Sequence, residues 1–278
     1  MNEKQRQNQR QNQKQEEKIE IETKRERTWC PGCTNYAVLS AYAKALKELI
    51  EEGKIERKKV VVVSGIGCHG KVHDYLNVTS INALHGRLLP VMLGIKIARP
   101  DVVVIGVSGD GDCYNEGIEH LIHFARYNVN ATLVVHNNQV FSLTAGQPTA
   151  TTQKGFASKT LNKALADEPL NPIKLMLSLD TGFVARCYAL DIEHTKEVLK
   201  EAIMHRGFSF VEVLQPCIVF NDTREFMGKR LVKSNSAKDA VSWDYTFDEN
   251  ARIAIGIFNK KQKPTFEEKY LQLDSLGQ

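Results

Sequence analysis

The sequence predicts an α/β fold, a doubly wound and mostly parallel sheet with helices on both faces. Short apolar segments rich in β-branched residues alternate with stretches whose apolar residues recur every three or four positions, the pattern of such folds. The chain has 278 residues, enough for one large domain or two small ones with a buried core. The expected strands lie at 60–63, 102–107, 131–135 and 208–214, with a weaker one at 183–188.

Helices are expected before and between these strands. The first spans 35–52, where apolar residues lie at helical spacing and Gly53 ends the pattern. Three more are predicted at 89–98, 117–127 and 193–205. Because ligands bind at the carboxyl ends of the strands in such sheets, the loops after the strands are where we expect the chemistry.

Both ends of the chain differ from this central region. Residues 2–17 contain only Asn, Gln, Glu, Lys and Arg, a composition that cannot bury apolar surface, so we expect 1–27 to be a disordered polar tail. From 221 onward charges are scattered and strand-like segments are scarce. We therefore expect a folded domain over 28–220, and a C-terminal extension over 221–278 that packs on the core or on a partner subunit.

Composition excludes several functions. With 37 basic and 33 acidic residues the formal charge is +4, which lacks the basic surplus of nucleic-acid-binding proteins. No apolar run approaches the roughly 18–20 residues that span a bilayer, so a membrane-spanning role is not expected. Six cysteines without a secretory signal pattern indicate thiols in a reducing compartment, so we expect the protein in the cytoplasm.

A pair of oxygen-rich loops predicts a site for a diphosphate and its metal ion. Gly109, Asp110 and Gly111 follow one expected strand, and Asn138 follows the next. A right-handed crossover places the two strand ends side by side or one strand apart. Glycines let the backbone approach a phosphate, while carboxylate, amide and carbonyl oxygens suit Mg²⁺. Gly-Asp-Gly alone is a common turn, but with Asn-Asn 28 residues later it resembles the thiamine diphosphate motif.

Four of the cysteines predict a metal centre. Cys30 and Cys33 form a Cys-x-x-Cys turn, and Cys68 and Cys217 follow the first and last expected strands. A redox pair of the thioredoxin type is disfavoured, because a charged segment and not a core strand precedes the turn. Four thiolates suit either a [4Fe–4S] cluster or a closed zinc site, and spacing does not choose between them. Cys113 and Cys187 are expected to be small buried hydrophobes.

With both groups of residues in view, the chain resembles the β subunits of 2-oxoacid:ferredoxin oxidoreductases, the pyruvate and 2-oxoglutarate synthases. Six segments match in order, and Pro264 to Glu268 echoes the family's C-terminal tail more weakly. Phe141 and Ser142 stand where the family usually has Tyr-Gly. This difference puts the substrate preference in question, and not the binding of the cofactors. The matching segments are Trp-Cys-Pro-Gly-Cys at 29–33, Gly-Ile-Gly-Cys at 65–68, His-Gly-Arg at 85–87, Gly-Asp-Gly-Asp at 109–112, Asn-Asn at 137–138 with Leu-Thr-x-Gly-Gln at 143–147, and Gln-Pro-Cys at 215–217.

The resemblance implies the cofactors and their ligands. It implies a [4Fe–4S] cluster on Cys30, Cys33, Cys68 and Cys217, and Mg²⁺ held by Asp110, Asn138 and the carbonyl of Val140. Lys71 and His85 are candidates to contact the substrate carboxylate, with Arg87 as a further cation. The other predicted contacts to thiamine diphosphate are Gly67, His69, Gly109, Gly111, Asp112, Leu143, Thr144 and Gln147.

The implied activity is oxidative decarboxylation of a 2-oxoacid, with pyruvate placed before 2-oxoglutarate, to acyl-CoA and CO₂. Electrons pass through the cluster to ferredoxin, and the family also runs the reaction in reverse. Thiamine enzymes need a glutamate from a pyrimidine-binding domain, for which a single α/β domain has no room. We therefore expect an α-type partner subunit and a hetero-oligomer.

Two other functions remain open at this stage. One is a non-redox thiamine diphosphate decarboxylase or synthase whose cysteines bind structural zinc. The other is a zinc-stabilised regulatory or scaffold protein that retains only the fold. Both alternatives predict zinc in place of iron, so the iron content of the purified protein would distinguish them from the oxidoreductase.

Overall fold

The computed structural model describes residues 19–242 and 252–271. Eight strands form one sheet with the order β2-β1-β3-β4-β8-β7-β10-β9, in which all neighbouring pairs are parallel except β7 and β10. The strands are β1 (Val60–Ser64), β2 (Thr79–Asn82), β3 (Val103–Gly109), β4 (Thr132–Asn137), β7 (Phe183–Tyr188), β8 (Ser209–Leu214), β9 (Leu231–Lys233) and β10 (Ile253–Lys260), with a separate hairpin of β5 (Val140–Phe141) and β6 (Gln147–Pro148).

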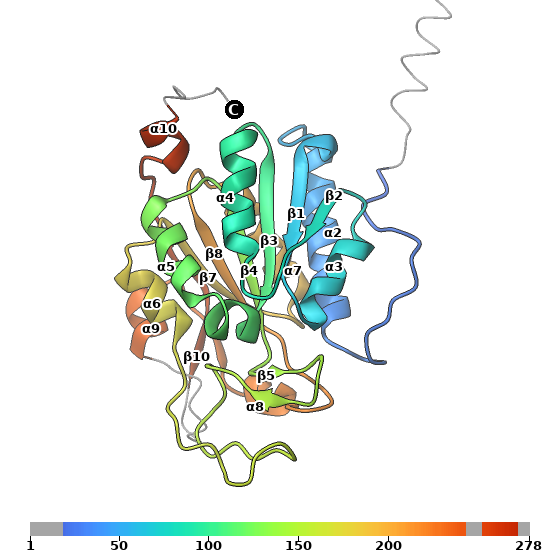
Figure 1. The fold of residues 1–278 in the computed structure, drawn as a ribbon, viewed down its shortest axis with the longest axis vertical. Helices are drawn as coiled ribbons and strands as arrows, with labels where there is room; N and C mark the ends of the chain where they lie inside the picture. Colours follow the sequence, from blue (N-terminus) through green and yellow to red (C-terminus); the bar gives the residue numbers. More distant parts are fainter. Residues whose placement is uncertain (1–18, 243–251, 272–278) are drawn as a thin grey trace, which may run out of the picture.

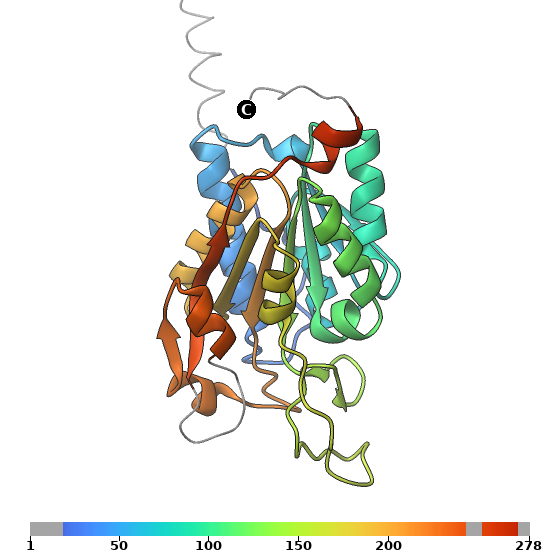
Figure 2. The same cartoon turned by 90° about the vertical axis from the view of Figure 1, so that its left-hand side faces the viewer.

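Helices cover both faces of the sheet, so the doubly wound α/β prediction is confirmed (Figures 1 and 2). One core contains α2, α3 and α7 against the sheet, and the other contains α4, α5, α6 and α9. The helices are α2 (Asn35–Glu51), α3 (Val72–Tyr75), α4 (Leu88–Ala98), α5 (Ile118–Tyr127), α6 (Pro172–Ser178), α7 (Ile192–Met204), α8 (Arg224–Gly228), α9 (Ala237–Ser242) and α10 (Phe266–Tyr270), with short helical turns at Arg57–Lys59, Cys68–Lys71 and Gly111–Asn115.

The four central strands end side by side at the lower edge of the sheet in Figure 1. Ser64 pairs with Val107, Gly109 with His136, and Asn137 with Leu214, so β1, β3, β4 and β8 finish in register. Every expected strand and helix of the central region is present, with bounds that differ from the expected ones by at most two residues. The loops that follow these four strands therefore meet at one place.

Two expectations outside the central region need correction. The C-terminal extension is not strand-poor, because β10 adds eight residues to the main sheet between β7 and β9. The described part of the predicted tail, 19–27, is anchored to the core at one point: Ile21 is 4% exposed and Glu22 forms a β-bridge with Leu76, whereas five of its nine residues are exposed. The predicted disorder of 2–17 lies outside the described residues. The edge strand β2 was not predicted from the sequence, because its four residues are all exposed and give no apolar pattern.

None of the described helices is both long enough and apolar enough to cross a membrane.

Candidate active site

The loops after β1, β3 and β4 surround a cavity of about 80 Å³, which we call the diphosphate cavity. It contains eleven of the predicted cofactor and substrate contacts, including both Asp110 and Asn138. Gln147 does not line it, but its side-chain oxygen accepts a hydrogen bond from the hydroxyl of the lining residue Thr144 at 2.5 Å. The lining residues are Ile66, Gly67, Cys68, His69, His85, Gly109, Asp110, Gly111, Asp112, Asn138, Val140, Phe141, Ser142, Leu143 and Thr144.

Glycine is required where the backbone of this cavity is most crowded. A Cβ on Gly109 would lie 2.5 Å from the His69 imidazole, and one on Gly111 would lie 2.2 Å from the Phe141 ring. Gly67 has a φ of +151°, which side-chain-bearing residues rarely adopt. Glycine at 109 and 111 therefore leaves room for the His69 and Phe141 rings that line the cavity, and close approach of a phosphate to this backbone stays a prediction.

Asp110 is a buried carboxylate in need of a cation. It is 2% exposed, and its Oδ2 accepts a hydrogen bond from the Thr149 hydroxyl at 2.6 Å. Burial raises the pKa of its carboxyl to about 7, although Thr149, Thr151 and backbone N–H groups oppose the shift. A divalent cation would compensate this desolvation. The carboxylate, the Asn138 amide and the Val140 carbonyl are hard oxygen ligands in one cavity, and this donor set fits Mg²⁺.

The Asn138 turn is held in a fixed shape. Its amide nitrogen donates to Ser142 Oγ at 3.1 Å and to Gln215 Oε1 at 3.3 Å. Its Oδ1 accepts from the Val140 N–H at 3.1 Å, and the intervening Gln139 has a φ of +63°. Backbone strain of this kind is stored where the surrounding structure supports it. The side-chain oxygen and the Val140 carbonyl thus lie on one turn beside Asp110.

Two histidines face Asp112, which holds the loops together. The Asp112 carboxylate accepts from Ser108 Oγ at 2.5 Å and from the Gly86 N–H at 2.8 Å. His69 Nε2 and His85 Nε2 lie 3.8 and 3.7 Å from its oxygens. Burial, with a smaller contribution from His85, lowers the pKa of His69 to about 3, so this ring is neutral near pH 7. Within the described residues its buried Nε2 has no hydrogen-bond partner, which leaves it available to a bound ligand.

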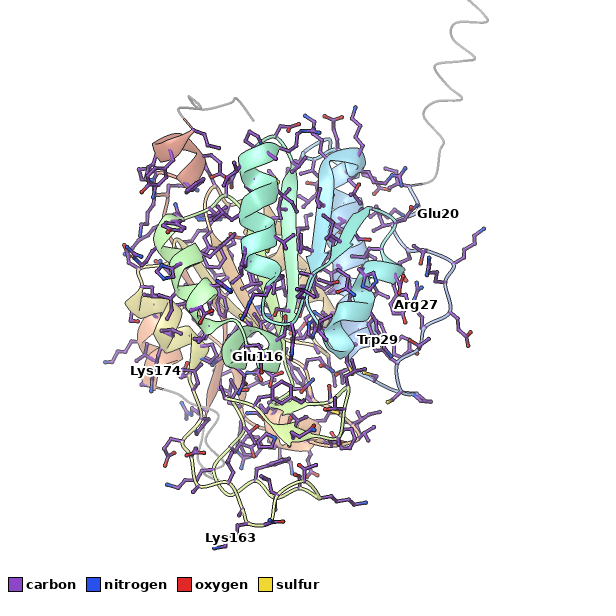
Figure 3. The ribbon with its side chains drawn as sticks, viewed as in Figure 1. Glu20, Arg27, Trp29, Glu116, Lys163 and Lys174 are labelled. Atoms are coloured by element: carbon purple, nitrogen blue, oxygen red, sulfur yellow. The ribbon has the colours of Figure 1, made fainter. Side chains whose placement is uncertain are left out.

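The four predicted cysteines line a second cavity of about 140 Å³, which we call the cysteine cavity. Burial raises the pKa of the Cys33 and Cys68 thiols, and neighbouring cysteines add to both shifts. Trp29, labelled in Figure 3, ties the Cys-x-x-Cys turn to the loop after β1, because its indole N–H donates to the Cys68 carbonyl at 2.7 Å. Four thiols around one cavity fit the donor set of a [4Fe–4S] cluster.

Among the described residues no three His, Cys, Asp or Glu side chains are arranged to hold a single metal ion. The four thiols border a cavity, as the ligands of a multi-iron cluster do. The remaining cysteines, Cys113 and Cys187, are buried in the core as predicted.

Two predicted cations lie elsewhere than expected. Lys71 lines the cysteine cavity and not the diphosphate cavity, and its Nζ donates to the Thr28 carbonyl at 2.8 Å. Arg87 donates to the carbonyls of Gly86 and Glu116 and so braces the turn before α4. His85 does line the diphosphate cavity.

Sequence reasoning missed the threonines that lie beside Asp110. Thr149 and Thr151 lie after the β5–β6 hairpin, in a segment without strand or helix periodicity. The only available signal was a run of polar residues, Thr149, Thr151 and Thr152, that proves to be buried. Gln215, which contacts Asn138, was visible only as part of the Gln-Pro-Cys segment.

Comparison with known proteins agrees with this geometry. Residues 65–213 match the family described as thiamine pyrophosphate enzyme, C-terminal TPP binding domain. The chain is 43% identical over 220 residues to a 2-oxoacid:ferredoxin oxidoreductase subunit beta of Saccharolobus solfataricus, covering 78% of this chain and 70% of that one. It is 36% identical over 246 residues to a 2-oxoglutarate synthase subunit KorB of Archaeoglobus fulgidus, covering 88% and 89%.

A solved structure is also similar. The 2-oxoglutarate:ferredoxin oxidoreductase of Magnetococcus marinus, with 2-oxoglutarate, coenzyme A and succinyl-CoA bound, superimposes with a TM-score of 0.83 at 28% identity, covering 91% of this chain and 88% of that chain. The sheet order, the diphosphate-binding loops and these relatives lead to one conclusion. The chain belongs to the family of 2-oxoacid:ferredoxin oxidoreductase β subunits.

Proposed function

We propose that this chain supplies the diphosphate site and the redox centre of an enzyme that oxidatively decarboxylates a 2-oxoacid. The 2-oxoacid anion and coenzyme A give acyl-CoA, CO₂, one proton and two electrons, and two molecules of ferredoxin accept the electrons one at a time. The observation that carries this proposal is that the two cavities share a wall. Cys68, Asn138, Ser142 and Leu143 line both of them. A redox centre would thus lie directly beside the cofactor, a proximity that structural zinc does not need.

The residues of the diphosphate cavity would bind and orient the cofactor. Asp110, Asn138 and the Val140 carbonyl would hold Mg²⁺, and the backbone at Gly109 and Gly111 would face the phosphates. The neutral His69 ring offers a polar atom to the cofactor without adding charge. When bound, thiamine diphosphate supplies an electron sink, which takes up the electron pair that remains when the carboxylate leaves as CO₂.

The cysteine cavity would hold the [4Fe–4S] cluster on Cys30, Cys33, Cys68 and Cys217. Lys71 lies at this cavity, and its charge offsets part of the rise that burial causes in the pKa of the Cys68 thiol, which would help to hold a thiolate ligand there. We therefore move the proposed role of Lys71 from the substrate to the cluster. His85, at the rim of the diphosphate cavity, remains the candidate for contact with the substrate carboxylate.

For the substrate we place 2-oxoglutarate before pyruvate, which reverses the order given by the sequence. The relatives with a specified substrate, from Archaeoglobus fulgidus and Magnetococcus marinus, are named for 2-oxoglutarate. The measurement is kcat/KM for both acids with the cognate partner. A higher value for pyruvate would reject this order.

An α-type partner and ferredoxin complete the proposal. The diphosphate cavity, at about 80 Å³, is far below the roughly 300 Å³ of a complete ligand pocket. Apolar side chains are exposed around it, with Leu84 78% and Leu143 49% exposed, and such exposure is typical of contact surfaces. We propose that the partner covers this surface and supplies the pyrimidine-binding domain, and that ferredoxin docks near the cysteine cavity. The cytoplasmic location and the extent of the diphosphate-binding domain, 28–220, stay predictions.

Metal analysis after purification without oxygen tests the proposal. We expect a brown protein with about four irons per chain. Replacing a proposed ligand, Cys217→Ser, should lower the iron content sharply. The matched control is Cys187→Ala, which alters a cysteine buried in the core and should keep the iron. A colourless protein with one zinc per chain would favour the non-redox alternative.

A further inference from the structure

A buried ion pair lies in the sheet close to the proposed metal site. Arg186 on β7 and Glu212 on β8 are opposite each other in the strand register. Arg186 Nε lies 2.6 Å from Glu212 Oε2, and neither side chain is exposed to solvent. Burying such a pair gains little stability compared with apolar residues of similar size. Its presence between otherwise apolar strands therefore suggests a role other than stabilising the core.

The ion pair fixes the orientation of Asn137. Glu212 Oε1 accepts a hydrogen bond from Asn137 Nδ2 at 2.7 Å. Because an ionised carboxylate only accepts hydrogen bonds, the amide nitrogen must face Glu212 and the amide oxygen must face the other way. There, Asn137 Oδ1 accepts from the Gln139 N–H at 3.1 Å and from the Thr151 hydroxyl at 2.8 Å.

This orientation determines which hydroxyl group holds Asp110. Thr151 Oγ1 lies 2.8 Å from Asn137 Oδ1 but 3.3 Å from Asp110 Oδ2. Since a hydroxyl has one proton to donate, the shorter contact to Asn137 takes it. The Thr149 hydroxyl, 2.6 Å from the same Asp110 oxygen, is then the one that donates to the carboxylate. A flipped Asn137 amide would redirect the Thr151 proton to Asp110.

We propose that Glu212 is a positioning residue for the diphosphate-metal site, acting through Asn137 and Thr151 on the Asp110 carboxylate; this rests on the proposed function. Glu212, paired with Arg186, keeps the Asn137 oxygen toward the metal-binding turn. Asn137 Oδ1 in turn accepts hydrogen bonds from the Gln139 N–H and the Thr151 hydroxyl, so neither group donates elsewhere. Asp110 lines the cavity, and its Oδ1, which accepts no side-chain hydrogen bond in the described structure, would be available to the metal.

Two variants test this chain of contacts in the complex of the full chain with its partner subunit. Glu212→Gln allows the side-chain amide to present either an oxygen or a nitrogen to Asn137. Thr151→Val removes the hydroxyl at nearly constant volume. The control is Thr132→Val, which removes a buried hydroxyl from the opposite end of β4, where it donates to the Ala202 carbonyl at 3.0 Å.

The readout is the Mg²⁺ concentration that gives half-maximal binding of thiamine diphosphate in equilibrium dialysis, with the thermal midpoint measured alongside. Residues that orient metal ligands typically change metal affinity about 10–100-fold. We expect at least a 10-fold rise in that Mg²⁺ concentration for both test variants and no change for Thr132→Val. The double variant should show less than the product of the two single effects, because both act on one chain of contacts.

The outcomes separate the two proposals. If the unaltered complex binds no thiamine diphosphate with Mg²⁺, the proposed function fails and this inference fails with it. If the unaltered complex binds but both variants match Thr132→Val, only the positioning role is overturned. Should Glu212→Gln not fold because Arg186 loses its counter-charge, the result for Thr151→Val decides alone.

Discussion

Asp110 is the residue on which the proposed diphosphate site depends most. Its carboxylate is buried, stands between Gly109 and Gly111 in the sequence, and lies beside the Thr149 and Thr151 hydroxyls. The raised pKa that burial gives it describes the carboxyl without a cation beside it. A metal ion would stabilise the charged form and so lower that pKa.

Asp110→Asn keeps the size of this side chain and removes its charge. We expect affinity for Mg²⁺ and thiamine diphosphate to fall by about 100-fold or more. Replacing residues that only orient the metal ligands already lowers metal affinity by about 10–100-fold, and Asp110 is a proposed ligand itself. Iron content should not change, because the cysteines lie in the other cavity. The control is Asp101→Asn, an exposed carboxylate near the opposite end of β3 that pairs with Arg99. Equilibrium dialysis measures the change, and affinity within a few-fold of the unaltered protein would contradict the assignment.

Residues at strand ends can be placed from the sequence, whereas long side chains in loops and residues in irregular segments cannot. Asp110 and Asn138 were predictable because both stand at strand ends, where topology alone brings them together. Lys71 was misplaced because a long side chain in a loop has many directions open to it, and the Thr28 carbonyl selects one of them. Thr149 was invisible because it reaches Asp110 from a segment without periodicity.

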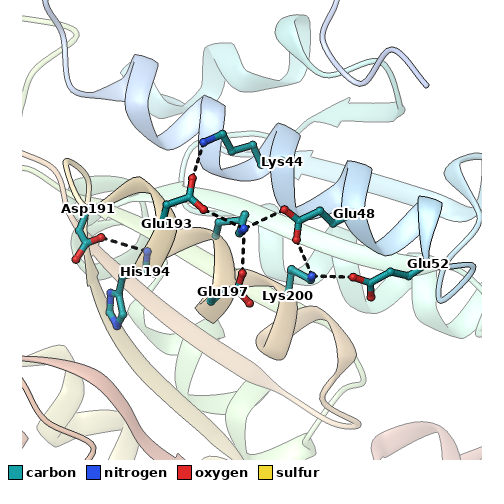
Figure 4. Close-up of polar contacts among 9 residues, drawn as sticks. Lys44, Glu48, Glu52, Asp191, Glu193, His194, Glu197 and Lys200 are labelled. Atoms are coloured by element: carbon teal, nitrogen blue, oxygen red, sulfur yellow. Dashed lines mark hydrogen bonds and ion pairs between the residues drawn. The ribbon is translucent and has the colours of Figure 1, made fainter. Parts of the chain in front are cut away.

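At the scale of elements, α2 and α7 are joined by a network of charges (Figure 4). Glu48 accepts from both Lys196 and Lys200, which in turn reach Glu193 and Glu52. Networks at a surface contribute more than isolated pairs, especially at high temperature. The pKa of Glu48 is lowered, chiefly by Lys200 and then by Lys196, and the pKa of Glu193 falls to about 2.

Glu48→Gln tests this network. We expect a fall in thermal midpoint of about 1–3 °C, and a smaller one in high salt. Because the folded-state pKa lies below the usual 4.5, the contribution is full above that pH and is lost as the pH falls through the folded pKa. The difference from the unaltered protein should therefore shrink in acid. Glu225→Gln removes one isolated exposed pair, with Lys229, and should change the midpoint less. Equal shifts for both variants would argue against a network.

The C-terminal helix α10 is tied to the core by a buried ion pair. Lys96 Nζ lies 3.7 Å from Glu267 Oε1 and donates to the carbonyls of Pro100 and Val102. Glu267 also accepts from the Asn130 N–H. This connection explains why α10 packs as part of the fold. It was hidden in the sequence, where Lys96 is a single charge in an otherwise apolar helix.

Glu267→Gln should destabilise the protein by about 3 kcal/mol, because it leaves the Lys96 charge buried without its partner. Urea unfolding measures the change. The double variant Lys96→Met with Glu267→Gln should recover most of that loss, since the uncompensated charge is then gone. A double variant as unstable as the single one would show that the charge pair is not the cause.

At the scale of the whole molecule, the alternation of strands and helices predicted the parallel part of the sheet. Each crossover from one strand through a helix to the next produces that pattern, so β1, β3, β4, β7 and β8 were all expected. The strand β10 was missed because it enters the sheet antiparallel, from a C-terminal region where strands and helices do not alternate regularly. The family resemblance supplied what topology does not encode, the nature of the cofactors.

The same topology explains how one chain brings two sites together. The loops after β1 and β4 contribute to both cavities, while the loop after β8 and the Cys-x-x-Cys turn before α2 complete the cysteine cavity. The central claim is that electrons released at the diphosphate cavity pass directly into the cluster beside it.

Anaerobic mixing of the brown complex with 2-oxoglutarate and coenzyme A, in the absence of ferredoxin, tests this claim most directly. We predict that the visible absorption of the cluster decreases as substrate is consumed and returns when oxidised ferredoxin is added. The Asp110→Asn complex should keep its absorption unchanged. Release of CO₂ from the 2-oxoacid with no change in cluster absorption would contradict the account.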